Sequence, residues 1–214
     1  MHPAGATPDF MIQLPRLYAI VDRSYFSCPE ELVSMAAQLS SAGLGLLQYR
    51  DKSGNARAIL EVALRLRRQL GASLRLIMND RADLVRAADF GGVHVGQEDL
   101  SVESARKVIG PSLWLGVSTH RPEQVEQADE TSADYIAIGP VFATSSKARP
   151  DPVVGLEGVR RVRSLTRKPL VAIGGITRQN CRSVLAAGAD SVAVISDLLP
   201  EPRKSAEEFL RRLE

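Results

Sequence analysis

The chain alternates between two hydrophobic patterns from residue 17 to its end. Short apolar runs are typical of buried strands, whereas apolar residues three and four positions apart are typical of amphipathic helices. The short runs predict strands at 17–21, 44–50, 74–78, 93–95, 113–117, 135–138, 170–173 and 191–195. The stretches between them predict helices at 29–42, 55–70, 81–88, 102–109, 122–128, 156–165, 178–187 and 206–213. Glycine closes several of these helices, as at Gly43 and Gly71.

Eight strand–helix units predict a parallel sheet, because a helical crossover must join each strand to the next. Eight units in a chain of 214 residues match the compact end of the (β/α)8 barrel range. We therefore predict an α/β fold, a single TIM barrel domain over residues 15–214, preceded by a short and potentially flexible arm at 1–14. The alternative is a doubly wound open sheet, but no G-x-G-x-x-G follows the first strand and nothing marks a switch point.

The composition fits one globular domain, with 44% hydrophobic and 24% charged residues. A net charge of +2, from 27 basic and 25 acidic residues, is too balanced to indicate a nucleic-acid or membrane partner. Two cysteines, Cys28 and Cys181, make no disulfide framework, and a reducing cytoplasm is the simplest setting. Residues 1–14 have no basic start and no long apolar run, so no signal peptide or membrane span is predicted. The oligomeric state stays open, and a homo-oligomer is one outcome.

Polar side chains gather where the predicted strands end, which is where barrel enzymes have their active sites. Gln48, Arg50 and Lys52 end the second strand and share one face, since alternate strand residues point the same way. A guanidinium beside an ammonium suits a phosphate or diphosphate. The alternative is a strand end that passes into a solvated loop.

Two carboxylates, Asp80 and Asp99, follow the next two strands. Carboxylates facing a diphosphate are a usual means of holding Mg²⁺. Each aspartate alone could instead cap the helix that follows it. Because the pair accompanies Arg50 and Lys52, we favour a metal site.

A second anion site is predicted after strands seven and eight, at Gly174-Gly175 and Ile195-Ser196, where barrels bind phosphate through backbone N–H groups. The long loop 139–154 carries Thr144, Ser146 and Lys147, and loops of this length often close over a ligand. For Lys147 taken alone, a solvated loop lysine is a strong alternative. His120 is a candidate acid–base group, while His94, Tyr49 and Trp114 are expected to be structural.

Together these motifs resemble thiamine phosphate synthase. The resemblance runs from about Leu17 to the end, and the segments that carry it are 48–52, 79–81, 92–99, 116–120, 135–142, 144–147, 171–176 and 194–196. It implies a (β/α)8 barrel that joins hydroxymethylpyrimidine diphosphate to hydroxyethylthiazole phosphate and releases diphosphate. Its small-molecule substrates and Mg²⁺ would be the partners of the chain.

The resemblance also implies roles for individual residues. Gln48 would face the pyrimidine. The diphosphate would be held by Arg50, Lys52, Asn79, Ser118 and Lys147, of which Arg50, Lys52, Ser118 and Lys147 would be catalytic. Asp80 and Asp99 would hold Mg²⁺. The thiazole phosphate would be held by Thr144, Ser146, Gly175, Ile195 and Ser196.

Departures from the family pattern affect packing positions: Tyr49, the segment 89–92 and Ser191. The nearest rival is the related thiazole tautomerase, which has no need of a diphosphate clamp. His120 keeps that rival open, because a histidine on this loop could move the proton. A non-catalytic barrel that binds phosphate ligands is the second rival, and the full set of cations and carboxylates argues against it.

Overall fold

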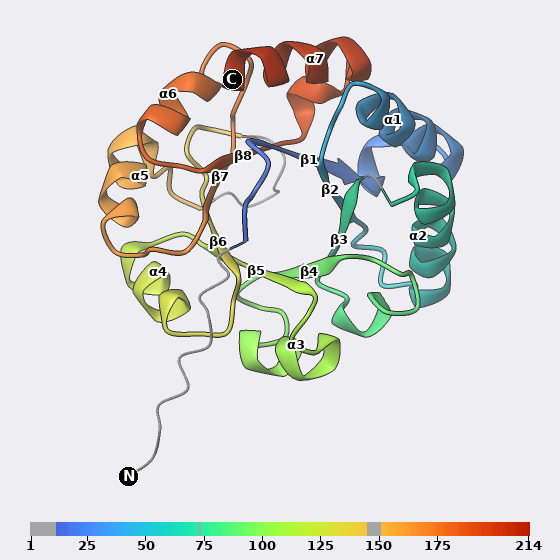
Figure 1. Cartoon of the computed structure of the whole chain (residues 1–214), viewed down its shortest axis with the longest axis horizontal. Coiled ribbons are helices and arrows are strands. Elements are labelled where there is room, and N and C mark those ends of the chain that lie inside the picture. Colours follow the sequence, from blue (N-terminus) through green and yellow to red (C-terminus); the bar gives the residue numbers. More distant parts are fainter. Residues whose placement is uncertain (1–11, 73, 145–150) are drawn as a thin grey trace.

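The computed structural model describes residues 12–72, 74–144 and 151–214. Eight parallel strands form a closed barrel in sequence order, and helices surround it (Figure 1), which confirms the predicted fold. The strands are β1 (Leu17–Asp22), β2 (Leu46–Arg50), β3 (Arg75–Asn79), β4 (Gly92–Val95), β5 (Trp114–Thr119), β6 (Tyr135–Ile138), β7 (Leu170–Ile173) and β8 (Ser191–Val194). The α-helices are α1 (Pro29–Ser41), α2 (Ala56–Leu70), α3 (Val102–Ile109), α4 (Pro122–Asp129), α5 (Gly155–Arg163), α6 (Cys181–Ala186) and α7 (Pro202–Leu213).

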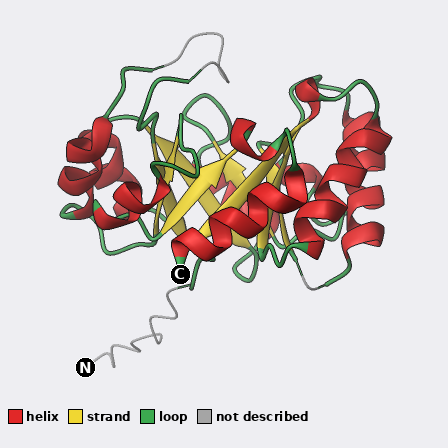
Figure 2. Ribbon diagram, turned by 90° about the horizontal axis from the view of Figure 1, so that it is seen from above, coloured by secondary structure: helices red, strands yellow, loops and turns green. Residues whose placement is uncertain are grey.

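The strands separate two apolar clusters, because successive strand residues point to opposite faces. On β1, Leu17, Ala19 and Val21 pack outward in the cluster shared with the helices, while Tyr18 and Ile20 belong to the cluster inside the barrel. Figure 2 shows the strands as an inner layer covered by the helices. Leu14, at the end of the expected arm, is also buried in the inner cluster, with Ile12 packed against it.

Local signals explain most helix boundaries. The side chain of Asn55 caps α2 by accepting a hydrogen bond from the Ala58 N–H at 3.1 Å, and Gly71, with φ of 65°, ends that helix. A proline in the first turn opens α1, α4 and α7. No helix within the described ranges is both long and apolar enough to cross a bilayer.

Three predicted helices differ from the structure by three residues or more at one end or both. Only a short 3₁₀ helix, η2 (Ala82–Leu84), forms within 81–88, because the chain enters it through Asp80 at φ 60°, with the Asp80 N–H bound to the carbonyl of His94 at 2.8 Å. The predicted start at 178 is wrong for α6, which begins at Cys181 after a turn in which Asn180 accepts from the Thr177 N–H at 2.8 Å. The last helix begins earlier than expected, at Pro202.

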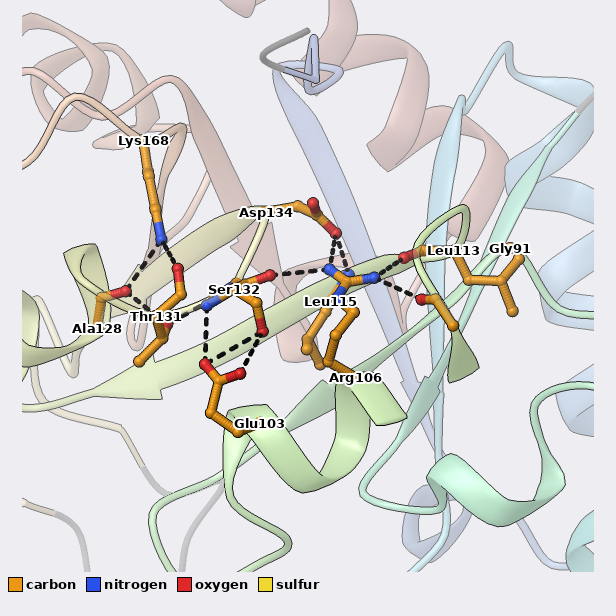
Figure 3. Close-up of polar contacts among 12 residues, drawn as sticks. Gly91, Glu103, Arg106, Leu113, Leu115, Ala128, Thr131, Ser132, Asp134 and Lys168 are labelled. Atoms are coloured by element: carbon orange, nitrogen blue, oxygen red, sulfur yellow. Dashed lines mark hydrogen bonds and ion pairs between the residues drawn. The ribbon is translucent and has the colours of Figure 1, made fainter. Parts of the chain in front are cut away.

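The amino ends of the strands are joined by a network of charged side chains (Figure 3). Arg106 donates to the carbonyls of Leu113 and Ser132, at 2.7 and 2.9 Å, and to the Asp134 carboxylate at 2.7 Å. Asp134 also accepts from the N–H of Leu115 at 2.7 Å. This end of a barrel generally serves stability, and these contacts tie α3 to the starts of β5 and β6.

Candidate active site

A cavity of about 750 Å³ lies at the carboxyl ends of the strands, within the usual size range of small-molecule sites. Every predicted site residue that the structure describes lines it, namely Gln48, Arg50, Lys52, Asn79, Asp80, Asp99, Ser118, Thr144, Gly175, Ile195 and Ser196. Ser146 and Lys147 lie outside the described residues. The barrel thus brings residues from seven strand ends, β2 to β8, into one space.

The two cations predicted after β2 each contact a carboxylate. Arg50 forms an ion pair with Asp22, its register partner on β1, and Lys52 forms one with Asp80. Asp22, whose side chain is only 3% exposed, was not among the predicted site residues. The alternation of β1 could have indicated it, because Asp22 shares a face with Tyr18 and Ile20 at the end of the strand.

Asp80 and Asp99 lie close enough to share a hydrogen bond. Burial and the neighbouring Asp99 raise the pKa of Asp80, although Lys52 acts against the rise. Burial also disfavours the charge on Asp99, but hydrogen bonds from Asp80 and the Gly96 N–H, the latter 2.8 Å long, lower the pKa of Asp99 overall. Two carboxylates this close resist carrying two negative charges at once.

Neither carboxylate caps a helix. Ser101 caps α3 by accepting from the Ser104 N–H at 3.3 Å, and η2, which follows Asp80, has no side-chain cap. The capping alternative is therefore wrong for both residues.

The carboxylate pair fits Mg²⁺. This ion takes one or two protein carboxylates and fills its other positions with water and phosphate oxygens. In the described parts of the chain, no three His, Cys, Asp or Glu side chains gather as a metal site, so no third residue of these types joins Asp80 and Asp99. A divalent cation would also remove the repulsion between the two carboxylates.

Asn79, at the end of β3, has a buried amide nitrogen without a hydrogen-bond partner among the described residues. A buried donor left unpaired costs about 1–3 kcal/mol. Asn79 lines the cavity, and a phosphate oxygen bound there would offer an acceptor to this nitrogen. Asn79 thus fits an anionic ligand beside Lys52 and Asp80.

Tyrosine and histidine side chains from the barrel interior reach the cavity floor. Tyr18 OH accepts from Gln48 Nε2 at 2.9 Å and lies 3.0 Å from Tyr135 OH. His94 contacts Tyr135 through Nδ1 and Ser118 through Nε2, at 3.1 and 2.9 Å. His94, expected only to be structural, therefore lines the cavity, and Tyr18 and Tyr135 were not predicted as site residues because aromatic residues in apolar strands resemble packing.

Two glycines, Gly174 and Gly175, line the β7–β8 side of the cavity together with Ile195 and Ser196. Gly174 and Gly175 have φ values of 100° and 63°, and a Cβ on Gly175 would overlap the carbonyl of Ala143. A Cβ on Gly174 would likewise overlap Pro140, so both positions need glycine for the close packing as well as for the positive φ. Ser196 lies two residues after the end of β8 and opens the 3₁₀ helix η3 (Ser196–Leu198).

His120 follows the end of β5 and lines the cavity. Its Nδ1 is 2.6 Å from the carbonyl of Gly139 and 3.6 Å from the Asp151 carboxylate. Because the carbonyl can only accept, Nδ1 carries a proton, and Nε2 is the ring nitrogen left to face other groups.

Relatives are similar to this chain over most of its length. A "Thiamine-phosphate synthase" of Koribacter versatilis (strain Ellin345) is 59% identical over 205 residues, which cover 94% of this chain and 97% of the relative. One of Shouchella clausii (strain KSM-K16) is 40% identical over 186 residues, covering 86% of this chain and 88% of the relative.

A solved structure supports the same relationship. The thiamine phosphate pyrophosphorylase from Pyrococcus furiosus superposes with a TM-score of 0.82 at 33% identity, covering 92% of this chain and 95% of the other. The family model for thiamine monophosphate synthase matches residues 17–198. On this evidence the chain belongs to the thiamine monophosphate synthase family.

Proposed function

We propose that the protein couples hydroxymethylpyrimidine diphosphate with hydroxyethylthiazole phosphate to form thiamine phosphate and diphosphate. The observation that carries this proposal is the cluster at the ends of β2–β4, where Arg50 and Lys52 stand beside the Asp80–Asp99 pair. A diphosphate with its metal needs both cations and carboxylates, whereas a monophosphate needs neither metal nor clamp.

The diphosphate would lie along this cluster. Arg50 and Lys52 would bind its oxygens, Asn79 and Ser118 would donate hydrogen bonds, and Lys147 would add a further cation. Their charges stabilise the leaving group most as the bond to it breaks, which is where electrostatic stabilisation raises the rate.

Asp80 and Asp99 would hold Mg²⁺, for which their paired carboxylates fit. The bound ion supplies a positive charge that offsets the charge growing on diphosphate. Lys52, which already contacts Asp80, keeps a second positive charge at the same place.

The thiazole phosphate would occupy the β7–β8 side, with Thr144, Ser146, Gly175, Ile195 and Ser196 as its binding residues. Backbone N–H groups in glycine-containing turns after strands seven and eight are a common phosphate site of barrels. Gln48, deeper in the cavity, would face the pyrimidine ring between the two anion sites.

The reaction needs positioning and charge stabilisation rather than a covalent nucleophile. The bond between the pyrimidine methylene carbon and the diphosphate oxygen breaks, and its electron pair leaves with diphosphate. The electron-rich aminopyrimidine stabilises the cationic carbon, and the lone pair of the thiazole nitrogen then forms the new carbon–nitrogen bond. The described cysteines have no place in this scheme, because Cys181 is buried and burial raises the pKa of its thiol.

The direct test supplies both substrates with Mg²⁺ and follows thiamine phosphate and diphosphate by chromatography. Equal amounts of the two products are expected. Isomerisation of a thiazole phosphate without coupling would instead identify a tautomerase, and tight binding without turnover would identify a binding protein.

We also propose a cytoplasmic location, which suits a biosynthetic enzyme whose two cysteines are both free.

A further inference from the structure

Five side chains form a continuous row of hydrogen bonds across the barrel interior. From β2 to β5 the order is Gln48, Tyr18, Tyr135, His94 and Ser118, with successive polar atoms 2.9, 3.0, 3.1 and 2.9 Å apart. Each residue comes from a different strand. We call this row the interior chain. It connects the amide proposed to face the pyrimidine with the hydroxyl proposed to bind diphosphate.

The barrel leaves space for the interior chain at Gly116 on β5. A Cβ at this position would overlap both the Tyr135 ring and His94 Nδ1. The rings of Tyr135 and His94 have centroids 5.5 Å apart, and Tyr18 meets Tyr135 edge-on with centroids 6.2 Å apart. Glycine is therefore what allows the two rings to meet.

The protonation of the central groups restricts how the chain can be arranged. Burial raises the pKa of Tyr18 and Tyr135, so each phenol keeps the single hydrogen that it can donate. The His94 ring is buried, and its two nitrogens contact a phenol and a hydroxyl instead of a carboxylate, so the ring is neutral and carries one N–H. A hydroxyl that accepted from both neighbours would leave its own buried hydrogen without an acceptor, which is costly, so each central group accepts from one neighbour and donates to the other. Only two arrangements remain, and they run in opposite directions.

The contact between Gln48 and Tyr18 selects one direction. Gln48 donates from Nε2, so Tyr18 donates to Tyr135 and Tyr135 donates to His94 Nδ1. The remaining hydrogen of His94 is then on Nε2 and points at Ser118 Oγ. In the opposite arrangement Ser118 would donate its hydroxyl hydrogen to His94, and only its oxygen lone pairs would face an anion.

We infer that Tyr18, Tyr135 and His94 are positioning residues that fix the hydrogen-bond direction at both ends of the site. At one end the direction leaves Gln48 Oε1 as an acceptor for the amino group of the pyrimidine. At the other end it leaves the Ser118 hydroxyl hydrogen free to donate to the diphosphate. The identity of these two ligand groups rests on the proposed function, whereas the direction of the chain does not.

Nitrogen NMR of the histidine side chains tests the direction without any turnover. The sequence contains three histidines, and a His94→Gln variant assigns the resonances of His94. We expect neutral His94 with its hydrogen on Nε2 at neutral pH. We also expect Tyr135→Phe to produce a mixture of both tautomers, because Nδ1 then loses its donor. A hydrogen on Nδ1 in the parent protein, or no change in Tyr135→Phe, would overturn the inference.

Ligand discrimination tests the consequence at Gln48. The parent should bind the aminopyrimidine diphosphate, with Mg²⁺, at least about tenfold more tightly than the analogue carrying oxygen in place of the amino group. In Tyr18→Phe the Gln48 amide is free to turn, so we expect this preference to fall severalfold while the affinity for thiazole phosphate is kept. A general loss of structure would weaken the binding of both the pyrimidine diphosphate and thiazole phosphate, and it would leave the preference for the aminopyrimidine unchanged.

Tyr49→Phe is the matched control for both tyrosine variants. Tyr49 is equally buried, but it packs in the outer cluster and its hydroxyl donates to Asp51 at 3.0 Å. It should keep the parental preference between the two pyrimidines. If Tyr18→Phe keeps the parental preference, the inference is refuted even if the parent forms thiamine phosphate. If the parent binds neither pyrimidine, the proposed function is refuted, and the NMR result still reports the direction of the interior chain.

Discussion

The Asp22 carboxylate pairs with the Arg50 guanidinium across β1 and β2, so the main cation of the proposed diphosphate site already has a buried counter-ion. The other oxygen of Asp22 accepts from the N–H and hydroxyl of Ser24, at 3.0 and 2.8 Å. This arrangement holds Arg50 in place before a ligand arrives, which reduces the ordering that binding must supply.

Asp22→Asn should leave Arg50 partly buried and without its counter-ion. We expect the free energy of unfolding to fall by about 1–3 kcal/mol, and pyrimidine diphosphate with Mg²⁺ to stabilise the variant more than it stabilises the parent. Thermal unfolding with and without ligand measures both effects. Glu30→Gln, at the exposed pair with Arg65, is the control and should cost at most about 0.5 kcal/mol. Parental stability in Asp22→Asn would contradict this role.

Removal of metal should stop the coupling reaction if Asp80 and Asp99 hold Mg²⁺. EDTA should abolish product formation and added Mg²⁺ should restore it. Asp80→Asn and Asp99→Asn should each lower the rate by roughly a hundredfold or more, since a positive charge near the leaving group is lost. Asp83→Asn is the control, because Asp83 pairs with Arg81 on the exposed surface. Full activity in EDTA would rule out the metal assignment.

His94 should make the stability of the fold depend on pH. Its folded pKa is about 4, below the value of about 6.5 in an unfolded chain. Between these values the unfolded chain binds a proton that the folded chain excludes, so the free energy of unfolding is highest above about pH 6.5 and falls as the pH is lowered toward 4. The loss should reach about 3 kcal/mol.

Urea unfolding of the parent and His94→Gln over this pH range measures the contribution of His94. The carboxylates titrate in both proteins, so the difference between the two curves isolates the histidine. Curves that stay parallel would show that His94 does not titrate in this way.

Arg106 should matter for stability and not for catalysis, because it lies at the opposite end of the barrel from the cavity. Arg106→Met removes the bonds to Asp134 and to the loop carbonyls, so we expect a loss of about 2–4 kcal/mol in the free energy of unfolding. The KM values of the folded variant should stay parental. Lys107→Met, at the exposed neighbouring position, should change neither quantity, and altered KM values in Arg106→Met would contradict this division of roles.

Periodic and capping signals were enough to predict the barrel. The predicted bounds of α3, β6 and β7 coincide with the structure, because each begins and ends on apolar residues and a glycine follows each of them directly. The prediction of a helix at 81–88 was wrong although the segment has helical spacing of apolar residues. Asp80 and Asp89, at φ 60° and 53°, turn the backbone at either end of the segment. Such backbone angles in aspartate depend on tertiary contacts.

The described part of the predicted site lines one cavity because strand ends meet at one rim of a barrel, a rule that needs no contact information. The partners of those residues were harder to predict. Asp22 looks like any polar residue at a strand end, and Tyr18, Tyr135 and His94 look like core residues. Their roles arise from contacts across the barrel between residues as far apart as Tyr18 and Tyr135, which no local pattern records.

The account depends most on which side of the cavity binds which phosphate, and Arg50→Lys tests this directly. Lysine keeps the charge but cannot bind two oxygens side by side as a guanidinium does. Steady-state coupling with each substrate varied in turn should show a rate lower by roughly ten- to a hundredfold and weaker binding of pyrimidine diphosphate. The affinity for thiazole phosphate should stay nearly unchanged. A variant that couples at the parental rate, or that loses thiazole phosphate and keeps pyrimidine diphosphate, would contradict the proposed arrangement.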